Sequence, residues 1–252
     1  MATRTRFQIE RLPVSAVQPS QWDEIWRLAE RFTDTTRAYF EDNVRQKDEV
    51  VLVRAGAAGE LLGLATVHTY AVEHAGRKVW VIYAGNTLLD PRLRGFNVFH
   101  KVGFASFMRV RLRNPLAPIY FFFDTYSYKS YLMLARNFGE YWPRRDRPMP
   151  EAVAAFIDHL GRHRYGELWD ASRRVCRSTG AKKLKSWVAE ITEADLANPE
   201  IRFYLAQNPG YREGEMLAAL APLSLPNWFS LVGNMLRRAR RPSGSKRAAA
   251  RV

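Results

Sequence analysis

The chain has 252 residues, 47% of them hydrophobic and 25% charged, a balance that is typical of a globular protein and excludes a largely disordered chain. Lys and Arg number 39 against 25 Asp and Glu, and the net charge of +14 favours anionic partners: a phosphorylated cofactor, an acidic carrier protein, nucleic acid or an anionic membrane surface. The single cysteine, Cys176, excludes an internal disulfide and a cysteine-based zinc site and indicates a reducing, cytoplasmic compartment.

The first part of the chain predicts a strand, two helices and an antiparallel meander. Trp22 and Ile25 fall on one face of a helix that Ser20 is placed to cap. Two strand-like runs are separated by a glycine-containing stretch at residues 55–60, which is typical of a β-hairpin. The expected elements are a strand at 7–17, helices at 18–32 and about 35–44, and strands at 49–56, 60–72 and 78–85.

A βαβα unit is expected next. Residues 97–113 place apolar side chains close to helical spacing, and Pro115 ends that helix. Residues 118–127 are almost wholly apolar, which is typical of a strand buried on both faces, and another helix is expected at 128–138. A helix that connects two strands of one sheet in this way makes those strands parallel.

The rest of the chain has a different composition. Residues 150–176 predict one or two amphipathic helices, and residues 215–224 predict a returning strand. We therefore expect a core at 1–147, a helical or mixed extension at 148–236 that completes the domain, and a basic, disordered tail at 237–252.

The turn at residues 86–99 (NTLLDPRLRGFNVF) has the chemistry of an anion site. The first amides of the helix that follows lack intrahelical partners, and the helix dipole adds partial positive charge, so that the two together bind phosphate. Gly95 lets a ligand approach the backbone closely, and Arg92 and Arg94 can donate charge-assisted hydrogen bonds to phosphate oxygens.

This arrangement resembles the GNAT superfamily of N-acyltransferases, whose acyl-CoA site carries the pattern [Gln/Arg]-x-x-Gly-x-[Gly/Ala] between a central strand and a helix. The segment RLRGFN supplies Arg92 and Gly95, with Asn97 in place of the final Gly or Ala. The order of elements over residues 7–147 also follows the superfamily. The resemblance implies an α/β (α+β) fold: a mixed, mostly antiparallel central sheet with a splayed parallel strand pair, flanked by helices, plus a helical C-terminal extension.

By the same resemblance, acyl-CoA is the donor substrate and lies in the gap between the splayed strands. Amides at the end of the first of these strands would receive the pantetheine arm, and the turn would hold the pyrophosphate. The aromatic run 120–123 would flank the acyl pocket, unless it is ordinary core. The expected donor-binding residues are Thr87, Leu88, Leu89, Arg92, Arg94, Gly95, Phe96 and Asn97.

Acyl transfer to an amine needs a base for the amine and an acid for the leaving thiolate. Many superfamily members use a tyrosine in the helix after the fifth strand, where this chain has Met133. The nearest substitutes are Tyr126, Tyr128 and Tyr131. His68 and His100 are candidate bases, with structural or surface roles as the alternative. Asp124, at the carboxyl end of the buried strand, could orient a histidine or bind the acceptor amine, or it could cap the next helix.

No metal site is expected. His159 and His163 are spaced as neighbours on a helix, but no nearby carboxylate or cysteine completes a ligand set, so a solvated helix face is the better interpretation.

The sequence thus predicts an acyltransferase that moves an acyl group from acyl-CoA, or from an acyl carrier protein, to a small-molecule or peptide amine. The alternative is a non-catalytic GNAT-like protein whose basic surface binds an anionic membrane or nucleic acid. Nucleic acid is the weaker partner, because only charge supports it.

Residues 226–241 (PNWFSLVGNMLRRARR) bear on the membrane alternative. Large apolar side chains beside arginines are typical of an interfacial helix on anionic lipid, while a helix docked on the domain with a solvated basic end also fits. No segment has the roughly 18 uninterrupted apolar residues of a membrane span, and the N-terminus has no signal-peptide pattern. We expect a cytoplasmic protein that lies, at most, peripherally on a membrane.

Overall fold

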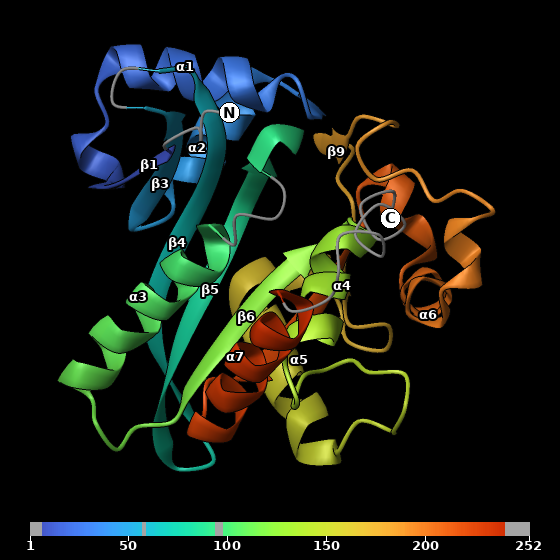
Figure 1. The fold of residues 1–252 in the computed structure, drawn as a ribbon. Coiled ribbons are helices and arrows are strands. Elements are labelled where there is room, and N and C mark those ends of the chain that lie inside the picture. Colours follow the sequence, from blue (N-terminus) through green and yellow to red (C-terminus); the bar gives the residue numbers. More distant parts are fainter. Residues whose placement is uncertain (1–6, 57–58, 94–97, 240–252) are drawn as a thin grey trace. The chain divides into compact units, whose positions relative to one another are not determined.

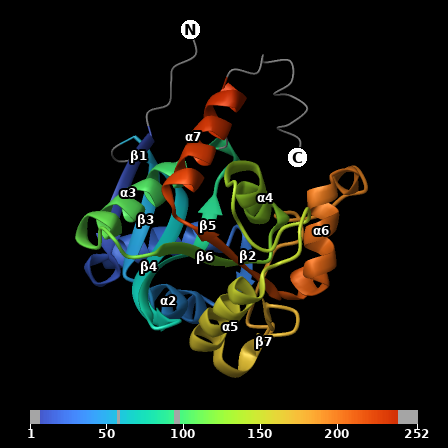
Figure 2. The same ribbon diagram turned by 90° about the horizontal axis from the view of Figure 1, so that it is seen from below.

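The computed structural model describes residues 7–56, 59–93 and 98–239. The chain divides into two compact units: Met1–Phe123 with Thr179–Val188, and Asp124–Ser178 with Ala189–Val252. Figure 1 shows the fold, and Figure 2 shows it turned by 90°. None of the helices in the described ranges has the length and apolar character that crossing a membrane requires.

The first unit is built on a sheet with the strand order β1-β3-β4-β5-β6. Its first four strands pair antiparallel, whereas β5 and β6 pair parallel from Trp80 with Ile119 to Tyr83 with Phe122. A separate small sheet joins β2 to β9. The strands are β1 (Phe7–Pro13), β2 (Thr33–Thr35), β3 (Glu49–Ala55), β4 (Leu61–His74), β5 (Arg77–Leu89), β6 (Ile119–Thr125) and β9 (Lys182–Leu184). The helices are α1 (Pro19–Ala29), α2 (Arg37–Arg45) and α3 (Val98–Arg113), with 3-10 turns at Val14–Ala16 and Pro91–Leu93.

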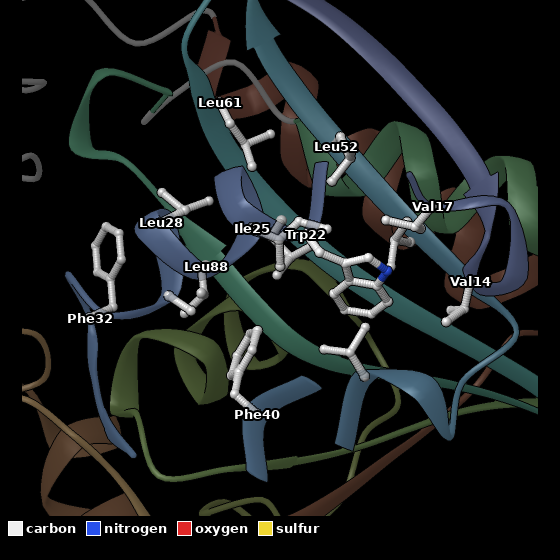
Figure 3. Packing of buried hydrophobic residues seen from close by; sticks show 14 residues of the cluster. Val14, Val17, Trp22, Ile25, Leu28, Phe32, Phe40, Leu52, Leu61 and Leu88 are labelled. Carbon is white, nitrogen blue, oxygen red and sulfur yellow. The ribbon is translucent and has the colours of Figure 1, made fainter. Parts of the chain in front are cut away.

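The core of the first unit lies where α1 and α2 meet one face of β3, β4 and β5. Figure 3 shows Trp22 and Ile25 of α1 and Phe40 of α2 packed with strand side chains such as Leu52 and Leu88. The apolar periodicity of residues 18–32 thus forms the buried stripe that it predicts. The cap is different from the prediction, because Gln18 and Gln21 form a reciprocal capping box and Ser20 does not cap.

A β-bulge interrupts the pairing of β4 with β5. Leu64 is opposite Leu88, but Thr66 is opposite Gly85, so that three steps along β5 match two along β4. Asn86 takes up the extra residue with a positive φ of 45°. The sequence predicts a turn from residue 86 onward, whereas β5 continues as a strand to Leu89.

The second unit contains four helices among its described residues and a small sheet with the strand order β10-β8-β7. Figure 2 shows α5 beside β7. The predicted returning strand is confirmed as β10, but the expected helical segment 150–176 ends at Tyr165, because Gly166 takes a φ of 54° and a hairpin follows. The helices are α4 (Tyr128–Asn137), α5 (Glu151–Tyr165), α6 (Pro199–Gln207) and α7 (Leu225–Ala239); the strands are β7 (Trp169–Asp170), β8 (Val175–Cys176) and β10 (Met216–Pro222); the 3-10 turns are Gly166–Leu168, Asp195–Ala197 and Pro209–Glu213.

The predicted fold class is confirmed by these elements. The β5-α3-β6-α4 order is the expected βαβα unit, and β5 and β6 are the expected parallel pair in a mostly antiparallel arrangement. The extension contains strands as well as helices.

Candidate functional site

The end of β5 is the place of the predicted donor site, and its pairing with the neighbouring strands changes along its length. Among the residues that the structure describes, the parallel pairing with β6 ends at Tyr83 and Phe122, while β5 runs on to Leu89 alongside β4. A strand edge that has lost its neighbour presents amides and carbonyls to a ligand. Thr87 is exposed on this stretch, whereas the side chain of Leu88 is buried in the core.

The turn after β5 is fixed by an ionic network around Asp90. The buried carboxylate of Asp90 accepts hydrogen bonds from the Arg92 amide and Nε, both at 2.9 Å, and from Arg31 at 2.7 Å. Both terminal nitrogens of Arg92 also donate hydrogen bonds to the Glu60 carboxylate, each at 2.9 Å. These contacts hold the pKa of Asp90 well below its usual range, chiefly through the Arg92 guanidinium. Arg92 is therefore engaged by carboxylates, and a phosphate would have to displace Glu60 to bind it.

The other half of the predicted phosphate site, Arg94, Gly95, Phe96 and Asn97, lies outside the described residues. The helix α3 is described from Val98 onward, directly after this stretch, as the predicted order of strand, turn and helix requires.

Beside the β5 bulge lies a group of polar side chains that we call the bulge cluster. Asn86 donates from Nδ2 to Asn43 Oδ1 at 2.9 Å and accepts from Lys182 Nζ at 2.5 Å. Lys47 Nζ donates to the Asn43 carbonyl oxygen at 2.8 Å. The chain of hydrogen bonds holds the left-handed conformation of Asn86 in place. The bulge cluster consists of Asn43, Lys47, Thr66, Tyr83, Asn86 and Lys182.

Two members of the bulge cluster are buried in an unusual way. Lys47 is only 5% exposed, and its ammonium group lies 5.9 Å from the centroid of the Tyr83 ring. Thr66 is fully buried, and its hydroxyl has no hydrogen-bond partner in the described part of the chain. The Tyr83 ring folds over Gly85, where an added Cβ would come within 2.9 Å of Tyr83 Cε1, so only glycine leaves room for it.

His68 is directly opposite Tyr83 in the β4–β5 pair. Its Nδ1 lies 2.9 Å from Asp48 Oδ1, and the other carboxylate oxygen of Asp48 accepts from the Thr69 amide at 2.6 Å. The His68 ring also stacks on Tyr70, with centroids 4.9 Å apart. Asp48 thus fixes the orientation of the imidazole, and a proton on Nδ1 leaves Nε2 able to accept one.

The remaining catalytic candidates belong to the second unit. Tyr131 is fully buried, with its hydroxyl 3.3 Å from the Pro143 carbonyl oxygen, and burial raises its pKa far above the usual range. Tyr126 is partly buried. Asp124 accepts a hydrogen bond from the Tyr165 hydroxyl and does not cap α4.

A hollow of about 560 Å³ also lies in the second unit. Its two arginines already have partners, because Arg173 forms an ion pair with Glu215 and Arg177 donates to the Glu167 carbonyl. The hollow therefore presents little unbalanced charge to a ligand. It is lined by Arg173, Arg177, Ser178, Pro209, Gly210, Glu213 and Glu215.

In the described ranges, no three His, Cys, Asp or Glu residues lie close enough together to hold a metal ion. His159 and His163 are both exposed on α5, as expected for a solvated face. Cys176 is buried, and burial raises the pKa of its thiol to about 12, which makes it a poor nucleophile.

No protein-family model and no curated protein matches the chain. Similar solved structures include a probable N-acyltransferase from Enterococcus faecalis V583, with 13% identity over 57% of this chain and a TM-score of 0.38. Escherichia coli ElaA has 13% identity over 58% of this chain and 94% of its own, with a TM-score of 0.33. A GCN5-related N-acetyltransferase from Kribbella flavida has 15% identity over 56% of this chain, with a TM-score of 0.39.

This chain spans 38% of the Enterococcus protein and 36% of the Kribbella protein. The GNAT-like character of the fold is carried by its own order of elements, in which β5 and β6 pair in parallel as far as Tyr83 and α3 lies between them in the sequence.

Proposed function

We propose that the protein is an N-acyltransferase that moves an acyl group from acyl-CoA, or from an acyl carrier protein, to an amine. The observation that carries the proposal is the end of β5, whose pairing with β6 stops at Tyr83 while the strand continues through the bulge to Leu89. An extended backbone edge suits a pantetheine arm, and the amides that begin a helix suit its phosphates. Along the chain the strand edge comes first and the beginning of the helix second. In coenzyme A the pantetheine arm likewise comes before the phosphates.

In the proposed reaction the amine nitrogen attacks the thioester carbonyl, the carbon–sulfur bond breaks, and the thiolate leaves with a proton. The pair of His68 with Asp48 is the best-supported base, because the hydrogen bond at Nδ1 leaves Nε2 to take the proton of the amine. Asp124 and Tyr126 belong to the second unit and stay predictions, while the burial of Tyr131 favours a structural role for that residue.

Calorimetry of acetyl-, octanoyl- and palmitoyl-CoA tests the donor site. We expect the wild type to bind at least one of them. Arg94→Glu removes charge-assisted hydrogen bonds, and Gly95→Trp fills the space through which the ligand approaches the backbone. Each variant should therefore weaken binding about tenfold or more. Arg113→Glu, a matched charge reversal at the exposed last turn of α3, should leave it unchanged. A wild type that binds none of the three, also when an acyl carrier protein is offered, contradicts the proposed function.

A second function, contact with a membrane, is favoured by the orientation of α7. On its inward side, Asn227 bonds to the backbone of Glu140, Asn234 donates to the Asn137 carbonyl at 3.0 Å, and Leu231 is buried. Three other large apolar side chains of the helix are exposed, with Leu225 at 68%, Phe229 at 75% and Val232 at 50%.

The spacing of these three side chains puts them on one stripe of the helix. Arg237 is exposed one turn beyond them, and the sequence continues with Arg238, Arg240 and Arg241. An apolar stripe followed by a basic cluster fits the interface of an anionic bilayer, where acyl chains cover the stripe and headgroups pair with the arginines. We propose anionic lipid as the partner of this face.

Co-sedimentation with vesicles tests this partner. We expect binding to phosphatidylcholine vesicles that contain phosphatidylglycerol, weaker binding without it, and a loss in Phe229→Glu. Leu116→Glu, a matched change at a 93% exposed leucine of the first unit, is the control. An equal loss of vesicle binding in both variants would mean that binding depends on net charge alone. If the protein is a dimer that Phe229→Glu dissociates, the exposed face contacts a second copy of the chain. Either result contradicts the lipid proposal.

A further inference from the structure

The helix α3 of the first unit has a buried side and an outer side (Figure 1). On the buried side lie Val102, Phe107 and Val110, each less than 9% exposed. Arg11 of β1 donates a hydrogen bond to the Ser106 hydroxyl at 3.0 Å. These contacts anchor the helix to the first unit and leave its outer side as a surface.

Large apolar side chains lie on the outer side of α3. Phe104 is 49% exposed, Met108 is partly exposed and Leu112 is 75% exposed. Because these residues are four apart in sequence, they form one stripe along the helix. We call Phe104, Met108 and Leu112 the α3 stripe.

The turn after α3 adds another exposed leucine. Leu116 is 93% exposed, and the turn that carries it is fixed to the helix, because Arg111 donates to the Pro115 and Ala117 carbonyls at 2.7 and 2.9 Å. A leucine exposed to this extent contributes almost no hydrophobic free energy to folding. Apolar side chains grouped at one place on a surface are typical of an interaction site.

The cations beside the α3 stripe are not matched by carboxylates. The helix contains no Asp or Glu, and its basic residues are Lys101, Arg109, Arg111 and Arg113. Among the residues that the structure describes, Arg109 is the only one of these four that forms an ion pair, and its partner Glu49 is shared with Arg11. Lys101 and Arg113 are exposed. The outer side of α3 therefore carries unbalanced positive charge.

The helix dipole explains only part of this pattern. It favours cations in the last turn, where Arg111 and Arg113 lie, and disfavours a cation near the beginning, where Lys101 lies. It has no bearing on the exposed apolar side chains. An apolar centre with charged groups around it is instead the composition of a protein interface. A second copy of the chain would not complement this face, because two positively charged surfaces repel each other.

The position of α3 in the chain bears on the kind of partner. Its first described residue, Val98, directly follows residues 94–97, which belong to the predicted phosphate site of the donor. A protein docked along α3 would thus lie next to the place where a donor's phosphate is expected. An acyl carrier protein is small and acidic, and it holds the acyl group as a thioester at the end of a phosphopantetheine arm.

We propose that the outer side of α3 docks an acidic acyl carrier protein. Acidic side chains of the carrier pair with the cations of the helix, its apolar side chains cover the α3 stripe, and its arm enters at the beginning of the helix. The inference rests on the proposed function and names the donor within it. The amine attacks the carrier's thioester carbonyl, the carbon–sulfur bond breaks, and the carrier's thiol leaves with the proton.

Calorimetry with apo acyl carrier protein, which lacks the phosphopantetheine arm, tests the docking surface apart from the donor site. We expect the wild type to bind it with an affinity that falls as the salt concentration rises. Arg113→Glu reverses a charge, and Leu112→Glu puts a carboxylate into the apolar contact, so each should weaken binding about tenfold. Both side chains are exposed, so neither variant should change the midpoint of thermal unfolding.

Two matched variants serve as controls. Arg27→Glu reverses the charge of an exposed arginine in the last turn of α1, and Phe229→Glu changes an exposed apolar side chain of α7; both should keep the affinity for the carrier. A wild type without affinity for the apo carrier overturns the inference, as does an equal loss in Arg113→Glu and Arg27→Glu. If Leu112→Glu loses vesicle binding and keeps carrier binding, the face contacts lipid and the inference is wrong.

Acyl-CoA separates this inference from the proposed function. Arg113→Glu and Leu112→Glu should keep the wild-type affinity for acyl-CoA, because neither residue belongs to the predicted donor site. A wild type that binds acyl-CoA but not the carrier overturns the docking surface and leaves the proposed function standing. Carrier binding that both variants weaken, without acyl transfer to any amine as read by product mass, supports the docking surface and contradicts the proposed function alone.

Discussion

Asn227 in the second unit and Thr66 in the first are both buried polar residues, but their hydrogen bonding differs. Asn227 is 2% exposed; its Nδ2 donates to the Glu140 and Pro222 carbonyls, and its Oδ1 accepts from the Glu140 amide, each at 2.7 Å. The Thr66 hydroxyl has no partner in the described ranges. A saturated buried group is accounted for by folding, whereas an unsatisfied one costs stability.

The largest expected effect is at Asn227. Replacing it with alanine leaves three partly buried backbone groups without this partner and should lower the free energy of unfolding by about 3 kcal/mol. Urea denaturation followed by circular dichroism measures this change. A loss below about 1 kcal/mol would mean that water satisfies these groups, and the contrast with Thr66 would weaken.

A smaller effect is expected at Asp90. This residue tests whether a buried polar group with all its hydrogen bonds formed also stabilises the first unit. The folded pKa of Asp90 lies below its usual value of 3.8, so its ion pairs stabilise the fold above about pH 4, and this stability is lost as the pH falls through the folded pKa. Asp90→Asn should therefore lower the free energy of unfolding at pH 7 by about 2 kcal/mol and flatten the acid limb of its pH profile. An acid limb identical to that of the wild type would show that Asp90 is not paired in solution.

The smallest effect on stability is expected at Thr66. Because its hydroxyl has no partner to lose, Thr66→Val should change the free energy of unfolding by less than about 1 kcal/mol, with either sign. The same denaturation series as for Asn227 provides the comparison. A loss as large as that of Asn227→Ala would reveal a hydrogen bond of the folded protein and remove the contrast between the two residues.

The local patterns of the sequence predict most elements of the fold. The apolar run at 118–127 and the proline at 115 are sufficient to define β6 and the end of α3. Residues 86–89 were harder, because Asn86 suggests a turn and its left-handed conformation is instead absorbed within a strand as a bulge. At residues 169–176, two-residue strands are too short to leave a periodic signal.

The candidate site was predicted less completely. His68 is recognisable from its residue type alone, but its partner Asp48 is twenty residues away, in the connection between α2 and β3. Lys182 reaches Asn86 only because β9 pairs with β2. No periodic pattern within residues 179–188 predicts that pairing. Such contacts depend on the tertiary fold, which a pattern in one segment does not encode.

The segment Thr179–Val188 has a practical consequence for dissecting the protein. It belongs to the first unit, yet it is flanked on both sides by residues of the second. A fragment that stops at Phe123 would lack β9 and the ammonium group of Lys182, so truncation would remove part of the bulge cluster together with the unit that was meant to be deleted. To obtain the first unit alone, residues 179–188 would have to be rejoined to it through a designed linker.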